Sequence, residues 1–262
     1  MSKLIDKLLQ TAETVSLPLG FRATKPSPAK PKMALIARVE PASNTAPLVD
    51  YVSSADAAII AQTGTGKDAA TDIARSLPDM VWGLWPEGKN RQQIKVSIEA
   101  GADFVILPLD AEFGLSGIEK TGKILLVESS LSESLIRTIN ELPVDAVLLA
   151  DDKGESSAIT WHQLMLCQRF ADLLSKPLLL TVPTAVNEDE LKALWKTGVD
   201  GVVIPVKTAQ QAKRLKVLRQ IINKPDFAAR PRKKVAALLP HIGEETSTAI
   251  NDAEEEEEEE EE

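Results

Sequence analysis

The fold of this chain is decided by three apolar runs, DAVLLA at 145–150, PLLLTV at 177–182 and DGVVIP at 200–205. None of them alternates apolar with polar residues along its length, and Val, Ile and Leu dominate each one. Strands that are covered on both faces have this composition, because neither face meets water. The segments between the runs space their apolar residues as helices do, so the pattern predicts alternating strands and helices.

Five earlier runs are of the same kind, and the eight starting positions are separated by 23, 23, 23, 20, 22, 32 and 23 residues. Eight strand-then-helix units predict an α/β fold, a compact (β/α)8 barrel. The alternative is a doubly wound open sheet. The five earlier runs are ALIARV from Ala34, AAIIA from Ala57, MVWGLW from Met80, DFVILP from Asp103 and KILLVE from Lys123.

The composition argues against several classes of protein, among them disulfide-bonded, zinc-binding and membrane-spanning ones. The chain has 262 residues, of which 44% are hydrophobic and 26% charged, with one Cys and two His. A single Cys cannot form an internal disulfide, and so few Cys and His argue against a zinc site or a His-based triad. No apolar run is long enough to cross a bilayer, and Asp6 and Lys7 interrupt what would be the core of a signal peptide. We therefore expect a cytoplasmic protein without a cofactor.

The charge is distributed unevenly, and this divides the chain. The net charge is -9, yet residues 1–33 have six basic and two acidic residues, whereas 244–262 have twelve acidic and no basic residues. A run of nine Glu cannot fold on itself because its charges repel. The expected segments are a helix at 1–21, a basic Pro-rich tether at 22–33, the barrel at 34–243 and a disordered acidic tail at 244–262.

The first segment, SKLIDKLLQTAETV at 2–15, has the pattern of an amphipathic helix. Such a helix next to a basic tether suits the interface of an anionic membrane. Two other occupants of its apolar face stay open, namely the bottom of its own barrel and a partner protein. The apolar face consists of Leu4, Ile5, Leu8, Leu9, Ala12 and Val15, and the neighbouring basic residues are Lys3, Lys7, Arg22 and Lys25.

A second basic feature lies on the last expected helix of the barrel. Lys213, Lys216 and Arg219 share one side of that helix, away from its apolar residues. Together with the first helix, they lead us to predict a non-catalytic peripheral protein at the inner face of the cell membrane. A weak anchor gains strength by multivalency, so we also expect a homo-oligomer that scaffolds or bends the membrane. No nucleic acid is expected, because the basic residues are not interleaved with aromatic ones. A soluble scaffold that docks a partner through the first helix is a further reading.

A metal-assisted lyase or aldolase is the enzymatic alternative, since active sites of such barrels lie at the carboxyl ends of the strands. The acids there serve equally well as helix caps. Trp82 and Trp85 are interpreted as packing residues. The candidate catalytic residues are Glu87, Asp110, Glu128, Asp151 and Lys207, and the other strand ends read Glu40, Gln62, Asp152 and Thr181.

Two phrases, GADFVILP at 101–108 and GVDGVVIPV at 198–206, resemble strands of phosphate-binding TIM barrels. The resemblance implies a phosphate held by backbone N–H groups in the loops after strands seven and eight. Here those loops read VPTA at 182–185 and PVKT at 205–208. Proline has no N–H to donate, so the phosphate loops are degenerate in this chain.

Overall fold

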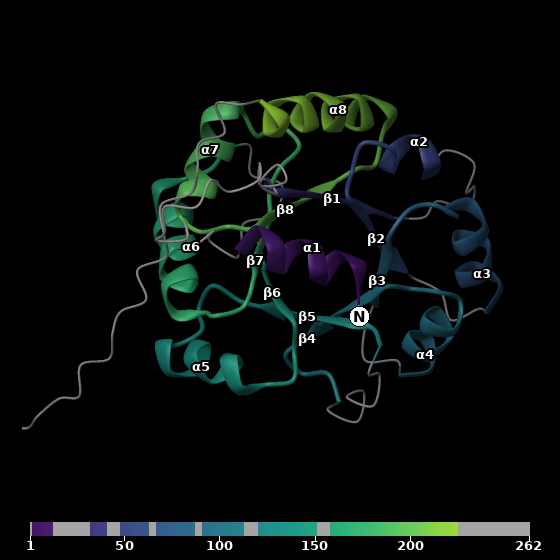
Figure 1. Ribbon diagram of the computed structural model, residues 1–262, viewed down its shortest axis with the longest axis horizontal. Helices are drawn as coiled ribbons and strands as arrows, with labels where there is room; N and C mark the ends of the chain where they lie inside the picture. The colour runs from purple at the N-terminus through teal and green to yellow at the C-terminus, as the bar shows by residue number, and fades with distance from the viewer. Residues whose placement is uncertain are drawn as a thin grey trace, which may run out of the picture.

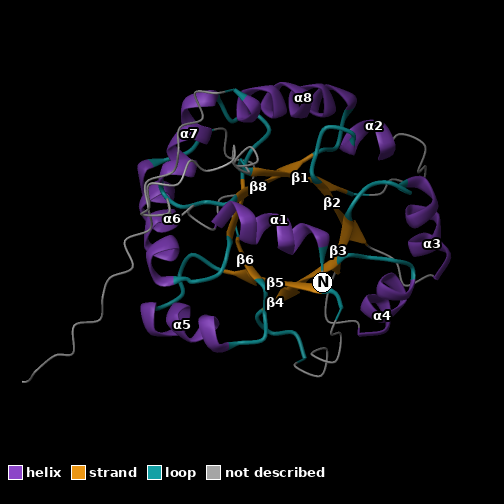
Figure 2. Ribbon diagram, in the orientation of Figure 1, coloured by secondary structure: helices purple, strands orange, loops and turns teal. Residues whose placement is uncertain are grey.

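The eight predicted strands are present and close into a barrel in the computed structural model, which describes residues 2–12, 32–40, 48–62, 67–86, 91–112, 120–150 and 158–224. Each strand pairs in parallel with the next, and β1 pairs with β8, so the open sheet is excluded. Figure 2 shows the ring of strands surrounded by helices. The strands are β1 Ala34–Val39, β2 Ala57–Gln62, β3 Trp82–Pro86, β4 Phe104–Pro108, β5 Gly122–Val127, β6 Ala146–Leu149, β7 Leu178–Thr181 and β8 Gly201–Pro205.

The helices that follow the strands cover the outside of the ring (Figure 1). Their apolar faces and the outward side chains of the strands form one buried layer, whose largest members include Phe170. Three helices begin with a capping box, in which Thr160, Asn187 and Thr208 accept the free N–H groups of the first turn. The helices of the outer layer are α2 Leu48–Val52, α3 Lys67–Ser76, α4 Arg91–Glu99, α5 Glu133–Thr138, the short 3-10 helix η2 Ile139–Glu141, α6 Trp161–Leu173, α7 Glu188–Lys196 and α8 Ala209–Asn223.

The first helix, α1 (Lys3–Ala12), lies across the end of the barrel where the strands begin (Figure 1). Its apolar residues Leu4, Ile5 and Leu8 are buried and belong to the same cluster as the inward side chains of the strands. The helix therefore plugs the bottom of its own barrel, which was one of the open alternatives. The strand residues of this inner cluster are Ala34, Ile36, Ala57, Ile59, Phe104, Ile106, Ile124, Ala146, Leu148, Leu179 and Val203.

Small residues at the start of the strands make room for α1. Ala34, Ala57 and Ala146 supply only a methyl group to the inner cluster, and β5 begins with Gly122. A Cβ at Gly122 would lie 2.7 Å from Cγ1 of Ile5, closer than two carbon atoms can approach. Glycine is thus required at this position because Ile5 of α1 packs against it, and not because of its own backbone conformation.

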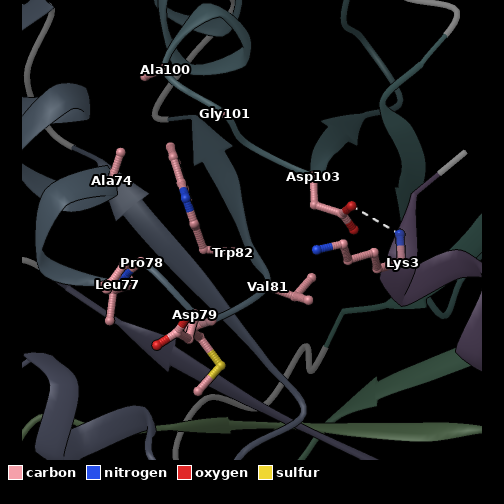
Figure 3. Close-up of a pocket in the computed structure, with 11 residues that line it drawn as sticks. Lys3, Ala74, Leu77, Pro78, Asp79, Val81, Trp82, Ala100, Gly101 and Asp103 are labelled. Carbon is pink, nitrogen blue, oxygen red and sulfur yellow. Dashed lines mark hydrogen bonds between the residues drawn. The ribbon is translucent and has the colours of Figure 1, made fainter.

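Aspartates at the starts of the even-numbered strands hold this end of the barrel together. Asp56, Asp145 and Asp200 each accept a hydrogen bond from a backbone N–H of the preceding strand. Asp103 accepts instead from α1, namely from the Ser2 hydroxyl at 2.6 Å and from two backbone N–H groups, of which Figure 3 shows that of Lys3. The unpaired N–H groups at a helix start carry partial positive charge, so a carboxylate is a favourable acceptor there. The three strand donors are Leu35, Lys123 and Leu178.

Candidate functional site

The opposite end of the barrel, where the strands end, carries a charged cluster centred on Arg38. Arg38 belongs to β1, and its guanidinium lies over the ring of Trp85 on β3, 4.5 Å from the ring centroid. Between them β2 contributes Ala61, which pairs with Trp85 in the register and is too small to separate the two side chains. A guanidinium over an indole face is held by the negative charge density of that face.

Two further charged groups meet beside Arg38. The carboxylate of Glu40 lies 3.6 Å from the guanidinium of Arg38 and 4.0 Å from the ammonium of Lys207. About half of each of the Glu40 and Lys207 side chains is exposed, so the attraction is screened by water and adds little to stability. The cluster is therefore an accessible charged surface at the mouth of the barrel and not a structural ion pair.

Two polar side-chain atoms of the strands are buried without a hydrogen-bond partner in the part of the chain that the structure describes, as are Oγ of Ser97 on α4 and Nε of Arg169 on α6. The two strand atoms are Nε of Arg38 and the hydroxyl oxygen of Thr181, which is two positions after the inward-facing Leu179 on β7. A buried polar group without a partner costs about 1–3 kcal/mol, so a ligand atom that pairs with such a group gains from the contact. Both atoms lie on the interior side of the strands, and both suit a ligand that carries oxygen atoms.

Of the predicted catalytic residues that the structure describes, only one is part of the cluster at Arg38. Lys207 joins the cluster through Glu40, whereas Asp110 and Glu128 are exposed at the ends of other strands. Glu128 accepts a hydrogen bond from the hydroxyl of Ser130, its neighbour in the following turn. Glu87, Asp151 and Asp152 lie outside the described residues. Within the described ranges, no three His, Cys, Asp or Glu side chains are grouped closely enough to hold a metal ion.

Sequence reasoning missed Arg38 and assigned Trp85 to packing alone. The signal was present in the run ALIARV, where Ala34 and Ile36 face the interior and Arg38 follows at the same period of two. A charged residue at an inward position of an otherwise apolar strand indicates a polar site at the strand end. Cross-strand neighbours such as Trp85 cannot be assigned from one sequence, because the register depends on how the barrel closes.

The residues expected to bind a membrane have several different locations. Leu4, Ile5 and Leu8 are at most 6% exposed inside the barrel, so they cannot also contact lipid in this arrangement. The expectation of a free apolar face on α1 is therefore corrected for these three side chains, because the barrel interior already covers them. Leu9 is 43% exposed, and Lys3 lies on the surface. Val15, Arg22 and Lys25 lie outside the described residues.

The basic residues of α8 are divided between two environments. Lys213 and Lys216 are exposed, as expected. Arg219 instead turns inward and pairs with Asp56 at 2.5 Å, so it does not extend an outward basic stripe. Lys7 of α1 pairs with the same carboxylate, which also accepts the N–H of Leu35. Within the described residues, no helix combines the length and the apolar composition needed to span a bilayer.

Asp56 thus connects α1, β1 and α8. Burial by itself would raise the pKa of this carboxyl group, because the charged form loses its hydration. The hydrogen bonds from Arg219, from the N–H of Leu35 and from Lys7 outweigh burial and lower the pKa below its ordinary value. The carboxylate is consequently ionised at neutral pH and serves as a structural anchor for the plug.

Known structures resemble this fold, although no protein-family model and no curated protein matches the chain. Thiamine phosphate pyrophosphorylase from Pyrococcus furiosus is 14% identical with a TM-score of 0.55, over 72% of this chain and 95% of that one. A mutant tryptophan synthase α-subunit from the same organism is 13% identical with a TM-score of 0.57, over 73% of this chain and 97% of that one. At such identities the likeness establishes a TIM-barrel fold and nothing about activity.

Proposed function

We propose that this protein is a TIM-barrel enzyme that binds a small organic anion at the mouth of the barrel. The observation that supports the proposal is a pair of buried atoms at the strand ends, Nε of Arg38 and the hydroxyl oxygen of Thr181, for which the described residues supply no hydrogen-bond partner. A carboxylate or phosphate oxygen would accept a hydrogen bond from each of them. Arg38 is suited to this role, because its donors form a planar fork and its charge does not titrate.

The reaction class is proposed from the groups beside Arg38. Glu40 and Lys207 lie within 4.0 Å of each other and stay accessible, so one can accept a proton while the other donates one. Lyase or aldolase chemistry on an anionic substrate can use such a pair, and the side chain of Lys207 ends in an amine that forms a Schiff base once it has lost its proton. The two similar structures belong to a pyrophosphorylase and a synthase, and they favour catalysis by analogy of fold only.

The proposal is tested by titrating the whole chain with inorganic phosphate and with pyruvate, while NMR follows the backbone amides of Thr181 and its neighbours. We expect saturable shifts at the strand ends of β1 and β7, and at least tenfold weaker binding in Arg38→Gln. Arg137→Gln, on the exposed surface of α5, is the matched control. Absence of saturable shifts with both anions, or equal weakening by the two variants, would contradict the proposal.

Peripheral binding to an anionic membrane, together with self-association, is a separate proposal that one observation supports. The favourable observation is that Lys213 and Lys216 are exposed together on α8. Co-sedimentation with phosphatidylserine vesicles should then fall in the double variant Lys213→Glu/Lys216→Glu and should not fall in Leu9→Ala. Equal pelleting of the double variant and the unmodified chain would refute this role, and sedimentation velocity on both would give the oligomeric state.

A further inference from the structure

The outward face of α6 carries two large apolar side chains. Trp161 is 83% exposed, and Met165, one turn further along the same face, is 69% exposed. Among the described residues, no other large apolar side chain is as exposed as these two. Adjacent apolar side chains left in water commonly mark a surface that another segment covers. We call Trp161 and Met165 the α6 patch.

Acidic side chains of α7 border the α6 patch. The backbone N–H of Ile159, two residues before Trp161, donates to Glu190 at 3.1 Å, so the start of α6 lies against the first turn of α7. That turn contains Glu188, Asp189 and Glu190. The surface therefore has an apolar part next to an acidic part, and a segment that matches it has apolar residues next to basic ones.

The sequence that follows α8 contains such a segment. Lys224 is the last residue that the structure describes, and the chain continues with PDFAARPRKK at 225–234 and VAALLPHI at 235–242. The first stretch ends in three consecutive basic residues, and the second begins with five consecutive apolar ones. No other stretch of 225–262 has five apolar residues in a row. Basic and apolar residues are thus adjacent here, as the surface of α6 and α7 requires.

The place where the described chain ends brings this segment within reach of the patch. The ammonium of Lys224 pairs at 2.5 Å with Glu188, in the same turn of α7 that contacts Ile159. α7 packs against both α6 and α8 (Figure 1), so α6 and α8 lie about 20 Å apart. The segment from Lys224 to Val235 can span up to about 36 Å when it is extended, which is enough to reach α6.

The size of the α6 patch argues for a tethered segment and against a second copy of the chain. A large aromatic side chain buries about 150–250 Å². A stable interface between two protein molecules buries about 800 Å² on each of them, and Trp161 and Met165 fall well short of that area. A short segment tethered to the same barrel needs less contact, because the tether gives it an effective concentration of about a millimolar.

We propose that the apolar stretch 235–239 docks on the α6 patch of its own chain. Leu238 and Leu239 pack against Trp161 and Met165, and both apolar surfaces leave water. The basic residues 232–234 directly precede this stretch and lie beside the acidic first turn of α7. Salt screens the attraction between these charges, so it guides the segment to the patch, whereas burial of apolar surface holds the segment there.

The test is paramagnetic broadening of NMR signals in the full chain, with a nitroxide spin label on His241→Cys, next to the apolar stretch. Cys167 is buried, so the reagent labels the introduced thiol alone. We expect loss of the indole N–H signal of Trp161 and of the methyl signal of Met165, because a nitroxide broadens nearby nuclei. Both signals should return when the nitroxide is reduced. Persistence of both signals in the labelled chain would refute the docking.

Variants of the tail test which residues make the contact. In the labelled chain, Leu238→Asp/Leu239→Asp should restore the Trp161 signal, because two carboxylates cannot be buried against an indole. Thr248→Asp/Ala249→Asp adds the same charges outside the apolar stretch and is the matched control. Equal effects of the two double variants would show that the apolar stretch is not what binds.

A variant of the patch and a mixing experiment identify the surface and its occupant. Met165→Asp, at an exposed position, should also restore the Trp161 signal, whereas Leu142→Asp, on another exposed leucine, should not. Spin-labelled chain without isotopes is then mixed with isotope-labelled chain that has no spin label. The signals of the α6 patch should remain in this mixture. Their loss would assign the patch to a second copy of the chain and would overturn docking within one chain.

Discussion

The carboxylate of Asp103, at the start of β4, accepts a hydrogen bond from the hydroxyl of Ser2, with 2.6 Å between the two oxygen atoms and 101 positions between the two residues in the chain. The same carboxylate accepts the N–H groups of Lys3 and Leu4, so a side chain of the barrel caps a helix that precedes the barrel. At the other aspartates of this end, the equivalent bonds join strand to strand. At Asp103, α1 therefore takes the place that a neighbouring strand has at the other three aspartates.

Replacing Asp103 with Ala should release the first turn of α1. The variant loses charge-assisted bonds to a helix start, and we expect the free energy of unfolding to fall by about 2 kcal/mol. Urea unfolding measures the loss, and hydrogen exchange at the amides of α1 should accelerate. Asp72→Ala on the exposed side of α3 is the control, with a change below about 0.5 kcal/mol. Unchanged exchange in α1 would show that Asp103 does not hold the helix.

Leu8 and Leu9 are adjacent residues with opposite expectations. Leu8 is fully buried, so Leu8→Ala should lower the free energy of unfolding by about 2–4 kcal/mol. Leu9 is 43% exposed, and Leu9→Ala should cost less than about 1 kcal/mol. An apolar face that served only a membrane would give small losses of stability for both. Thermal unfolding of the two variants without lipid therefore distinguishes a plug from a free anchor.

Gly122 offers a test of the close approach between β5 and α1. A methyl group at this position meets Cγ1 of Ile5 at 2.7 Å and the Ser2 hydroxyl oxygen at 2.8 Å. Gly122→Ala should therefore destabilise the protein by about 1–3 kcal/mol, although alanine is otherwise tolerated in a strand. The loss should shrink in an Ile5→Ala background, where part of the obstruction is absent. Equal costs in both backgrounds would mean that the helix is not the obstacle.

The pH dependence of stability should contain a contribution from Asp56. Its pKa in the folded state lies below the ordinary value of 3.8. Its contribution is therefore complete above that ordinary value and is lost as the pH falls through the folded pKa. We expect Asp56→Asn to be less stable than the unmodified chain at pH 7, with the difference shrinking below about pH 4. A constant difference between pH 7 and pH 2.5 would contradict this linkage.

Cys167 should report on the integrity of the helical layer. Its side chain is buried on α6, and burial raises the pKa of the thiol to about 12. Thiolate is the reactive form, so the folded protein should react with Ellman's reagent at pH 8 far more slowly than the urea-unfolded protein. Rapid reaction in the absence of urea would indicate that α6 opens frequently. The same assay on Leu8→Ala shows whether loss of the plug loosens the outer layer.

The barrel could be predicted from the sequence because each strand is apolar on both faces. The predicted starts, such as Ala34, Asp145 and Asp200, lie within two residues of the observed strand starts. The site was harder to predict, since Arg38 acquires its partners through the closure of the barrel and not through spacing along the chain. The membrane hypothesis had the same weakness, because periodicity shows that a helix has an apolar face but not what covers that face.

A signal for the plug nevertheless existed in the composition of the strand starts. Ala34, Ala57, Gly122 and Ala146 are small, and side chains of this size cannot fill the lower end of a barrel by themselves. The hole that they leave requires an insert, and α1 is the amphipathic segment next to the first strand. Reading strand composition layer by layer would have favoured the plug over the membrane.

The ion pairs of Asp56 join an early segment of the chain to a late one. Lys7 leaves the ribosome early, whereas Arg219 belongs to the last described helix, and the cavity for Leu8 also needs side chains from β7 and β8. We therefore expect α1 to dock only after the barrel has closed. Until then its apolar ridge remains uncovered, so chains interrupted before α8 should be far more prone to aggregation than complete ones.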